Sequence, residues 1–430
     1  MSDALKMGLR SIIYRKKQYV SIFLVCLFGI GISVFSIFLI DGMLDALENK
    51  ARIYYGGDYQ FLGGTANYEF FDYGNYIEDL KTVFPENSVI APRIFSGDNS
   101  GGTVALYFEG TGVRQRVING VDFTIEKDLF SSLNFHSGSM NEMAGSDGIL
   151  LSMAIADILE VRVGDSITLM VNTGKYGINT VELVVKGIFT DSSLFGMYTS
   201  YIDIDCFREA FKYPENCINR ICITLPEGYD SEALAASYQE VLETKYPMYE
   251  QVSNKQLFYD HRSSMGFPNY ALLTLSSNLN EVKILIDAMK LISAFVILIL
   301  MLIVIIGVSS TFRVIVIKRI NEIGIYKAIG MRYGKIMGML LTETMFLLVA
   351  GCLSGFVFAS VLCLFARFFN LSFIPAFDIF LSNGVLVPNI KVVYFLILSF
   401  VMIVTTVIAV FFRIRKSVAV PPCEALSVTE

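Results

Sequence analysis

Residues 291–312 read LISAFVILILMLIVIIGVSSTF, an apolar run that contains no charged side chain. A helix of this length, rising about 1.5 Å per residue, crosses a hydrocarbon core of about 30 Å. Three further runs are as long and apolar, and only Glu343 interrupts them with a charge: Tyr19–Ile40, Met337–Phe365 and Val392–Phe412. The sequence therefore predicts a membrane α-helical protein with four transmembrane helices.

The spacing of these runs predicts the domain organisation. One run lies near the start and three lie in the last third, so residues 41–290 form a polar stretch long enough to fold as a domain. The composition agrees, with 54% hydrophobic and 17% charged residues. We expect a membrane protein with one large extramembrane excursion.

The charges predict the orientation of the chain. Basic side chains gather before the first run, between the second and third runs and after the fourth, whereas residues 41–290 hold 18 Lys and Arg against 34 Asp and Glu. Because Lys and Arg in short loops stay in the cytoplasm, both termini are predicted inside and the acidic domain outside. The first run is longer than a signal-peptide core and lacks an A-x-A-like cleavage site, so we expect an uncleaved anchor. The expected location is a cytoplasmic membrane, which the chain crosses several times.

Pattern predicts a large α+β extracytoplasmic domain on helical stalks. Residues 42–52 and 278–290 have helical character, with Val282, Leu285, Ile286 and Met289 on one face of the latter, so both membrane helices are expected to continue outward. Strand-like alternation occurs at 103–109, 115–119, 166–172 and 181–189. Helices are expected at 76–83, 152–159, 204–211 and 231–244, the last with Asp230 or Ser231 as its N-cap.

Catalytic motifs are absent from the sequence. We find no G-x-S-x-G or H-E-x-x-H, and the Gly-Lys pairs at 174–175 and 334–335 lack the Ser or Thr of a phosphate-binding loop. His136 and His261 are isolated, and the seven cysteines show no metal spacing. The three cysteines of the outer domain, Cys206, Cys217 and Cys222, allow at most one disulfide, which we leave open. We predict a non-catalytic chain without its own cofactor or metal.

The loop between the second and third runs, residues 313–336, is the most specific segment. Isoleucines interleave there with basic residues, which predicts a short amphipathic helix, and Gly330 and Gly334 suit its end and the following turn. Such a helix either lies on anionic lipid or docks into a cleft of a cytoplasmic partner. The residues alone leave both interpretations open.

The run from Arg319 to Gly330 fits the pattern R-x-x-E-I-G-x-x-K-A-I-G, followed by Glu343, Gly351 and Gly355 in the next run. This pattern resembles the MacB/FtsX-type ABC transporter permeases, and the layout of one span, an outer domain and three spans is similar over essentially the whole chain. The resemblance implies an ATPase-coupling helix that is seated on a separate ABC ATPase, which binds the ATP and Mg. The coupling residues it implies are Arg319, Glu322, Ile323, Gly324, Lys327, Ala328 and Gly330.

The outer domain resembles most closely the lipoprotein-releasing LolC/LolE-type permeases. Five short pieces carry this likeness: 91–94, 118–122 with Glu126, 148–152, 159–168 and 184–189. It implies a β-rich inserted subdomain at 119–200. Two departures stand out: Phe123 replaces a proline of many relatives, and the hairpin 171–181 is shorter and lacks the proline-bearing hook that recruits a periplasmic carrier. Carrier recruitment therefore stays open.

Together, the pattern and the resemblance divide the chain as follows: amphipathic elbow 1–18, span 19–40, outer domain 41–290, span 291–312, coupling loop 313–336, span 337–365, outer loop 366–391, span 392–412 and cytoplasmic tail 413–430. The resemblance implies a complex that works by mechanotransmission. It contains a second permease, which is the same or a related chain, and the complex releases lipoprotein cargo. Candidate lipid or cargo contacts are Phe23, Phe28, Phe35 and Phe38.

Three alternatives to lipoprotein release stay open. The chain could expel peptides or amphiphiles as MacB-like systems do, signal to cell-wall hydrolases as FtsX-like proteins do, or anchor an outer enzyme. The anchored enzyme is disfavoured because it explains neither the coupling loop nor the three closing spans. The cargo, the choice between homodimer and heterodimer, and a single- or double-membrane host are not determined by the sequence, and no nucleic-acid partner is expected.

Overall fold

The computed structural model describes residues 16–421, apart from 66–68, 97–103, 174–176, 192, 194, 197, 198, 262, 263, 265, 372, 373 and 383. Residues 1–15 of the predicted elbow 1–18 lie outside the described residues, and residues 16–18 belong to the first membrane helix. The chain divides into two compact units: residues 1–43, 286–369 and 386–430 form the membrane unit, and residues 44–285 and 370–385 form the outer unit.

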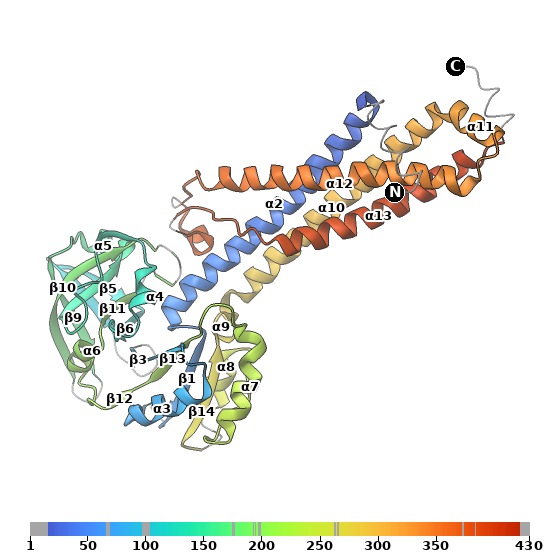
Figure 1. The fold of residues 1–430 in the computed structure, drawn as a ribbon. Coiled ribbons are helices and arrows are strands. Elements are labelled where there is room, and N and C mark those ends of the chain that lie inside the picture. The colour runs from blue at the N-terminus through green and yellow to red at the C-terminus, as the bar shows by residue number, and fades with distance from the viewer. Residues whose placement is uncertain are drawn as a thin grey trace. The chain divides into compact units, whose positions relative to one another are not determined.

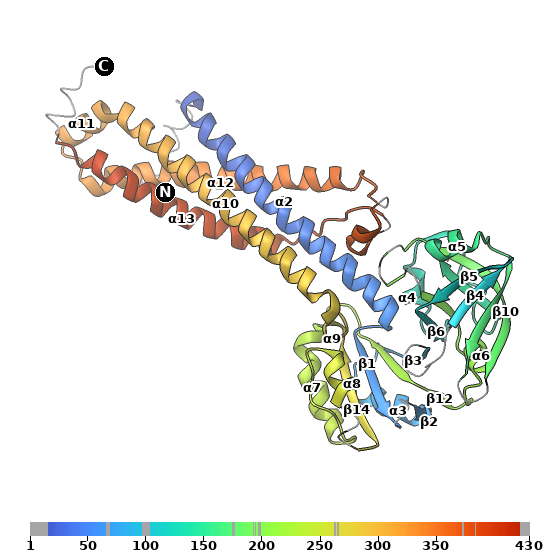
Figure 2. The same ribbon diagram turned by 180° about the vertical axis from the view of Figure 1, so that it is seen from behind.

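Four long helices make up most of the membrane unit: α2 (Lys16–Tyr55), α10 (Asn280–Lys318), α12 (Tyr333–Ala366) and α13 (Val392–Ala419). Figures 1 and 2 show them alongside one another, with the short helix α11 (Ile320–Ala328) between α10 and α12. All four are long and apolar enough to cross a membrane. The predicted membrane fold class is confirmed. Helices α2 and α10 continue beyond the apolar runs, because residues 43–55 and 280–290 contain neither Gly nor Pro.

Glycines allow α2 and α12 to pack closely. A Cβ on Gly351 would lie 2.4 Å from Cys26 Cβ, and one on Gly31 would lie 3.1 Å from the Gly355 carbonyl oxygen. Small residues spaced by four on a transmembrane helix let two backbones approach, and Gly351 and Gly355 have this spacing. This contact places α12 against the middle of α2.

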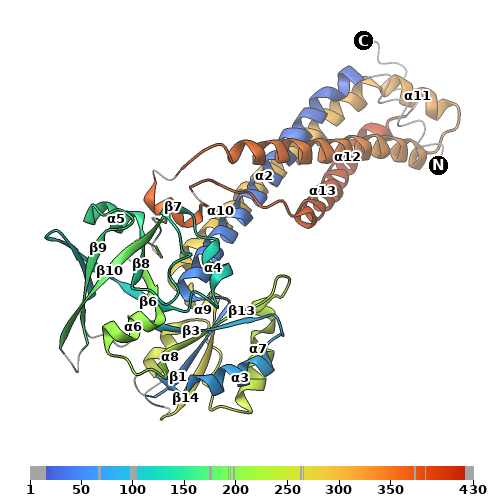
Figure 3. The ribbon, with the colours of Figure 1, turned by 60° about the vertical axis from the view of Figure 1, so that its left-hand side comes forward.

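The outer unit is built on a mixed sheet. Among the described residues, twelve strands form this sheet in the order β14-β1-β13-β3-β6-β11-β8-β10-β9-β4-β5, with β7 also paired to β10. The pairs β6–β11 and β8–β10 are parallel, and the other pairs are antiparallel. Figure 3 shows the strands β1, β3, β13 and β14 in one part of the sheet and β8, β9 and β10 in another.

The strands have these bounds: β1 Tyr59–Gly64, β3 Val89–Phe95, β4 Val104–Phe108, β5 Thr111–Gln115, β6 Val117–Val121, β7 Phe135–Gly138, β8 Gly148–Ser152, β9 Ser166–Asn172, β10 Ile178–Phe189, β11 Thr199–Asp203, β13 Arg220–Thr224 and β14 Asn269–Thr274. A separate pair joins β2 (Phe70–Phe71) to β12 (Cys217–Ile218). The strands within 119–200 thus belong to one sheet together with β4 and β5, which precede that range.

Helices cover the sheet: α3 (Tyr73–Val83) packs on β3, α7 (Ser231–Glu243) on β14, and α6 (Ile204–Phe211) on β6. The others are α4 (Lys127–Ser131), α5 (Met153–Leu159), α8 (Lys255–His261), α9 (Leu275–Asn278) and the 3₁₀ helix η2 (Pro375–Phe380). Asp230 caps α7 by accepting hydrogen bonds from the backbone N–H groups of Glu232 and Ala233, as predicted. The buried core contains aliphatic strand residues and an aromatic cluster around Phe61, Phe70 and Tyr270.

Candidate functional site

The short helix α11 begins directly after α10, with only Arg319 between them. Arg319 is the N-cap and leaves the helical region (φ −104°, ψ 13°), which separates the two helices. At the other end, Gly330 has φ 89°, a left-handed conformation that glycine adopts without a steric cost. A helix is therefore present at the predicted place, bounded by Arg319 and Gly330, but apolar side chains lie on both its buried and its exposed face, so it lacks the single apolar face that was predicted.

A buried ion pair anchors α11. The Arg319 Nη1 donates to Glu343 Oε2 at 2.8 Å and to the Tyr19 hydroxyl oxygen at 3.2 Å, and the Tyr19 hydroxyl donates to the same Glu343 oxygen at 2.8 Å. Only 3% of Arg319 and none of Glu343 is exposed. Arg319 Nε also pairs with Glu322 Oε2 at 3.2 Å. The network ties α11 to α2 through Tyr19 and to α12 through Glu343.

A second contact ties α11 to α13. The Lys327 ammonium donates to the Val420 carbonyl oxygen at 2.6 Å, and burial lowers the pKa of Lys327. The Tyr333 hydroxyl, at the start of α12, donates to the Arg415 carbonyl oxygen at 3.3 Å. Helix α11 is thus held by side chains that reach α2, α12 and α13.

The residues of α11 divide into an inner and an outer face. Ile323 and Gly324 are buried, and Glu322 and Lys327 are half-buried. The exposed face contains Ala328 and Gly330 from the predicted set, and also Ile325 (51% exposed) and Ile329 (74% exposed). Of the seven predicted coupling residues, Arg319, Ile323 and Gly324 are therefore buried inside the protein.

Ile325 and Ile329 were not predicted as site residues. Their spacing of four residues places them on one side of a helix, opposite Ile323 and Gly324. That spacing is the signal in the sequence that identifies them. Ile325 and Ile329 therefore form a small exposed apolar surface on this helix. We refer to Ile325, Ala328, Ile329 and Gly330 as the α11 outer face.

The four phenylalanines predicted to touch lipid or cargo differ in position. Phe28 is half-exposed and lines an apolar groove of about 640 Å³ between α2 and α10, together with Val20, Leu24, Ile32 and Ile303. Phe23 and Phe35 are partly buried. Phe38 is fully buried, and its ring packs edge-to-face on Phe356 with ring centroids 6.2 Å apart. Phe38 is therefore a packing residue of the bundle, whereas Phe28 faces the groove.

The end of α2 is bonded closely to the outer unit. Arg93 on β3 is fully buried, and its Nη1 donates to the carbonyl oxygens of Ile53 and Tyr54 at 2.8 and 3.2 Å. Its other nitrogens pair with the Glu126 carboxylate at 2.7–3.0 Å. Burial by itself lowers the pKa of Arg93, and the Glu126 carboxylate more than offsets this effect, so the pKa lies above its ordinary value.

The remaining carbonyls of this last turn are also satisfied. The Arg52 carbonyl oxygen accepts from the N–H groups of Gly56 and Gly57, and the Tyr55 carbonyl oxygen accepts from Gln60 Nε2 at 2.6 Å and Cys222 Sγ at 3.3 Å. A helix end leaves four carbonyls without intrahelical partners, and here each has one. Residues 91–94 and Glu126, two of the pieces that carry the resemblance of the outer domain, thus meet at the end of α2.

Metal and catalytic sites were not expected. Within the described part of the chain, no three His, Cys, Asp or Glu side chains lie close enough to hold a metal ion. The six cysteines that the structure describes are buried and carry free thiols.

These features define a class: a multi-pass membrane protein with a large extramembrane domain, a transmembrane helix that continues into that domain, and a short helix between its second and third spans. Residues 294–422 match the family model "FtsX-like permease C-terminal", and residues 23–241 match "MacB-like periplasmic core domain". The second match covers just over half of the chain. The chain belongs to the MacB/FtsX-like family of ABC transporter permeases. Membership implies an ABC ATPase partner and a dimeric permease.

Among solved structures, the periplasmic region of MacB from Actinobacillus actinomycetemcomitans is similar at 11% identity and a TM-score of 0.33, over 54% of this chain and 95% of that one. No curated protein matches the sequence.

Proposed function

We propose that this chain is the non-catalytic membrane subunit of an ATP-driven transporter, and that a separate ATPase seats on the α11 outer face. The observation that carries the proposal is the pairing of an exposed apolar surface at Ile325 and Ile329 with a buried anchor at Arg319. Because buried hydrogen bonds fix α11 to its neighbours, a force applied to its exposed face displaces those neighbouring helices and does not merely deform α11. In this proposal the ATPase binds the ATP and Mg, and the chain lies in the bacterial inner membrane with the outer unit outside.

In this proposal, ATP-driven movement of α11 is transmitted to the outer unit through hydrogen bonds and ion pairs. Displacement of α11 acts through Arg319 on Tyr19 of α2 and on Glu343 of α12. Helix α2 is continuous from Lys16 to Tyr55, and its last carbonyls are bonded to Arg93, Gln60 and Cys222. A rise or tilt of α2 therefore acts directly on the sheet of the outer unit, at its strands β1, β3 and β13.

The test is binding and stimulation of the ATPase. The chain is purified together with a candidate ABC ATPase from the same organism, and Ile329→Glu and Ile325→Glu variants are compared with Ile178→Glu, which alters an equally apolar exposed residue of β10. We expect the α11 variants to lose copurification and permease-dependent ATP hydrolysis, and the β10 variant to keep both. Retention of both activities by Ile325→Glu/Ile329→Glu would contradict the proposed docking face.

We further propose that the cargo is a lipid-anchored molecule, most simply a lipoprotein, and that its acyl chain enters the groove at Phe28. The groove lies between α2 and α10 and is lined by apolar side chains. Each buried CH₂ of a lipid anchor adds about 0.8 kcal/mol of membrane affinity, so extraction requires an energy source. ATP hydrolysis by the partner supplies it.

A photo-crosslinking amino acid at Phe28 tests this cargo, with Phe400 on α13 as an exposed control position. Capture of acylated proteins at position 28 alone, lost when ATP is restored, supports the proposal. Equal capture at both positions, or capture of free lipid only, would overturn it and leave the ATPase docking intact.

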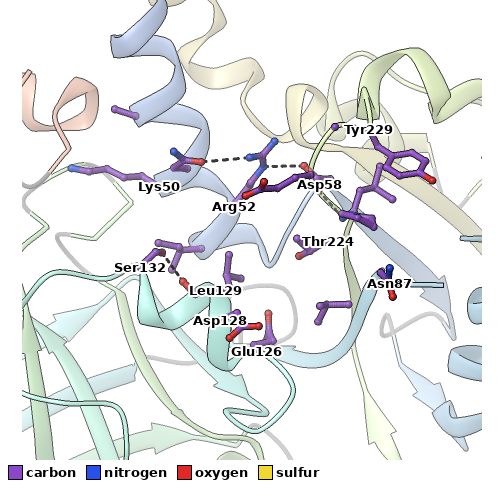
Figure 4. A pocket seen from close by; sticks show the side chains of 18 of the residues that line it. Lys50, Arg52, Asp58, Asn87, Glu126, Asp128, Leu129, Ser132, Thr224 and Tyr229 are labelled. Carbon is purple, nitrogen blue, oxygen red and sulfur yellow. Dashed lines mark hydrogen bonds and ion pairs between the residues drawn. The ribbon is translucent and has the colours of Figure 1, made fainter. Parts of the chain in front are cut away.

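Efflux of peptides or amphiphiles is a second candidate function. It is favoured by a cavity in the outer unit that is lined by both polar and apolar side chains (Figure 4). Capture of a cell-wall hydrolase, without cargo, would instead indicate signalling.

A further inference from the structure

The end of the membrane unit that carries α11 also carries exposed basic side chains. They lie at the start of α12 and in the last turns of α13, two helix ends that are joined by the hydrogen bond from the Tyr333 hydroxyl to the Arg415 carbonyl oxygen. Figures 1 and 2 show both helix ends near α11. The exposed basic residues of this end are Arg332, Lys335, Arg413, Arg415 and Lys416.

In the part of the chain that the structure describes, the protein does not neutralise these five charges. None of the five side chains forms an ion pair there. The one acidic residue within 313–336 and 413–421 is Glu322, and it pairs with Arg319. The dipole of α12 adds to the positive charge, because the first turn is the positive end of a helix and contains no acidic residue here. This end therefore offers positive charge to a partner from outside the chain.

An exposed apolar stripe on α13 leads to these charges. Val404, Ile408 and Phe412 are 39%, 50% and 60% exposed, and each follows the one before by four residues. This spacing places them on one side of the helix, and the exposed Lys416 continues the series at the next turn. At 1.5 Å per residue the distance from 404 to 416 is about 18 Å, slightly more than one leaflet of a hydrocarbon core that is about 30 Å thick.

From the charges and the stripe together we propose that the end of α13 binds an anionic phospholipid. Its phosphate oxygens accept hydrogen bonds from Arg413 and Lys416, and an acyl chain lies along Phe412, Ile408 and Val404. Clusters of basic residues that directly follow a membrane helix bind anionic headgroups. A free phosphate ion would use the charges and leave the stripe uncovered, whereas a phospholipid uses both.

This lipid is a bound component of the subunit and is distinct from the cargo. Helix α11 is connected to the chain just beyond α13, because the Lys327 ammonium donates to the Val420 carbonyl oxygen at 2.6 Å. A lipid that holds the end of α13 at the membrane surface therefore also helps to fix α11. The consequence for ATPase docking rests on the proposed function, but the binding of the lipid does not.

The absence of tryptophan from the chain allows a site-specific test. A single Trp is introduced as Phe412→Trp, with Phe400→Trp as the positional control, since Phe400 is 68% exposed on the same side of α13 but about 18 Å away. The full-length chain is reconstituted without ATPase in vesicles of equal parts phosphatidylcholine and phosphatidylglycerol. One lipid or the other carries bromine, which quenches tryptophan fluorescence, so the quenching measures which lipid lies at each position.

We expect phosphatidylglycerol to be preferred at position 412 and neither lipid to be preferred at position 400. In Arg413→Gln/Lys416→Gln the preference at 412 is expected to fall by about fivefold or more, because each cation near an anionic surface contributes about that factor. The control Lys81→Gln/Lys127→Gln, which removes the same charge from exposed positions of the outer unit, is expected to leave the preference unchanged.

Three results would overturn the proposal: an equal preference at positions 412 and 400, an unchanged preference in Arg413→Gln/Lys416→Gln, or an equal fall in the outer-unit control. If Arg413→Gln/Lys416→Gln keeps the lipid preference and instead loses copurification with the ATPase, the cations belong to the ATPase contact and not to a lipid site. Because the quenching measurement contains no ATPase, its failure leaves the proposed transporter function intact.

Discussion

Arg319 Nη1 and Glu343 Oε2 lie 2.8 Å apart in the membrane unit, and both side chains are buried. One charge lies at the junction of α10 and α11 and the other lies within α12. Removing one member of such a pair leaves the other charge buried without compensation. Substitution of either member is therefore expected to weaken the packing of α11 against α12.

Substitution of Arg319 by alanine is expected to destabilise the membrane unit by about 3–5 kcal/mol, because Glu343 is then left charged and unpaired. Substitution of both residues by Met is expected to restore most of the stability while the ATPase no longer responds to the permease. Thermal unfolding in detergent and permease-dependent ATP hydrolysis measure the two effects. Glu142→Gln, at an exposed pair with Lys186, is the control and is expected to cost about 0–1 kcal/mol. A double Met variant with full ATPase coupling would show that the pair serves stability alone.

Arg93→Ala is expected to loosen the end of α2. It removes the donors to the Ile53 and Tyr54 carbonyl oxygens and leaves Glu126 buried. The expected cost is about 3–5 kcal/mol, with faster amide hydrogen exchange in residues 53–60. Arg93→Ala/Glu126→Ala, which removes both charges, separates the lost capping bonds from the unpaired carboxylate. Exchange at 53–60 that stays slow in both variants would argue against the capping role.

Gly351→Ala is expected to disrupt the contact of α12 with α2, because the added Cβ would lie 2.4 Å from Cys26 Cβ. Gly338→Ala on the same helix is the matched control, since its Cβ meets nothing within 4 Å. Alanine favours a helix over glycine by about 1 kcal/mol, so Gly338→Ala is expected to be neutral or stabilising. Equal thermal stability of the two variants would show that the two helices separate at little cost.

Acid is expected to weaken the attachment of α3 to the segment after α7. Hydrogen bonds from Tyr246 and Lys245 hold the pKa of Asp79 below its ordinary value of 3.8. Since the folded-state pKa is the lower one, this stabilisation is present above about pH 4 and is lost as the pH falls through the folded-state value. The effect is modest because Asp79 is partly exposed to solvent. Denaturant unfolding of the wild type and of Asp79→Asn, compared from about pH 6 to about pH 3, should show curves that converge at the acid end. A constant difference over this range would exclude the linkage.

Parts of the fold are local enough to be predicted. Helix α6 and strand β9 have the predicted bounds, and α7 begins after its predicted Asp230 cap, because a period of 3.6 or 2 and a capping side chain act over a few residues. The order of the sheet was not predicted. Its neighbours β1 and β14 are separated by about two hundred residues of chain, and β3 pairs with both β13 and β6. Pairing over such distances depends on packing of the whole domain.

The sequence by itself determined the four spans, the excursion and a short helix at 320–328, because hydropathy and helical period depend only on the identity and spacing of residues. It also marked Arg319 and Glu343, but as members of a pattern. Only the tertiary structure decided that these two side chains meet, that Ile325 and Ile329 point outward, that Phe38 packs inward and that Arg93 bonds to the end of α2. The physical reason is that a side chain's environment is set by the elements packed around it, and those elements come from distant parts of the chain.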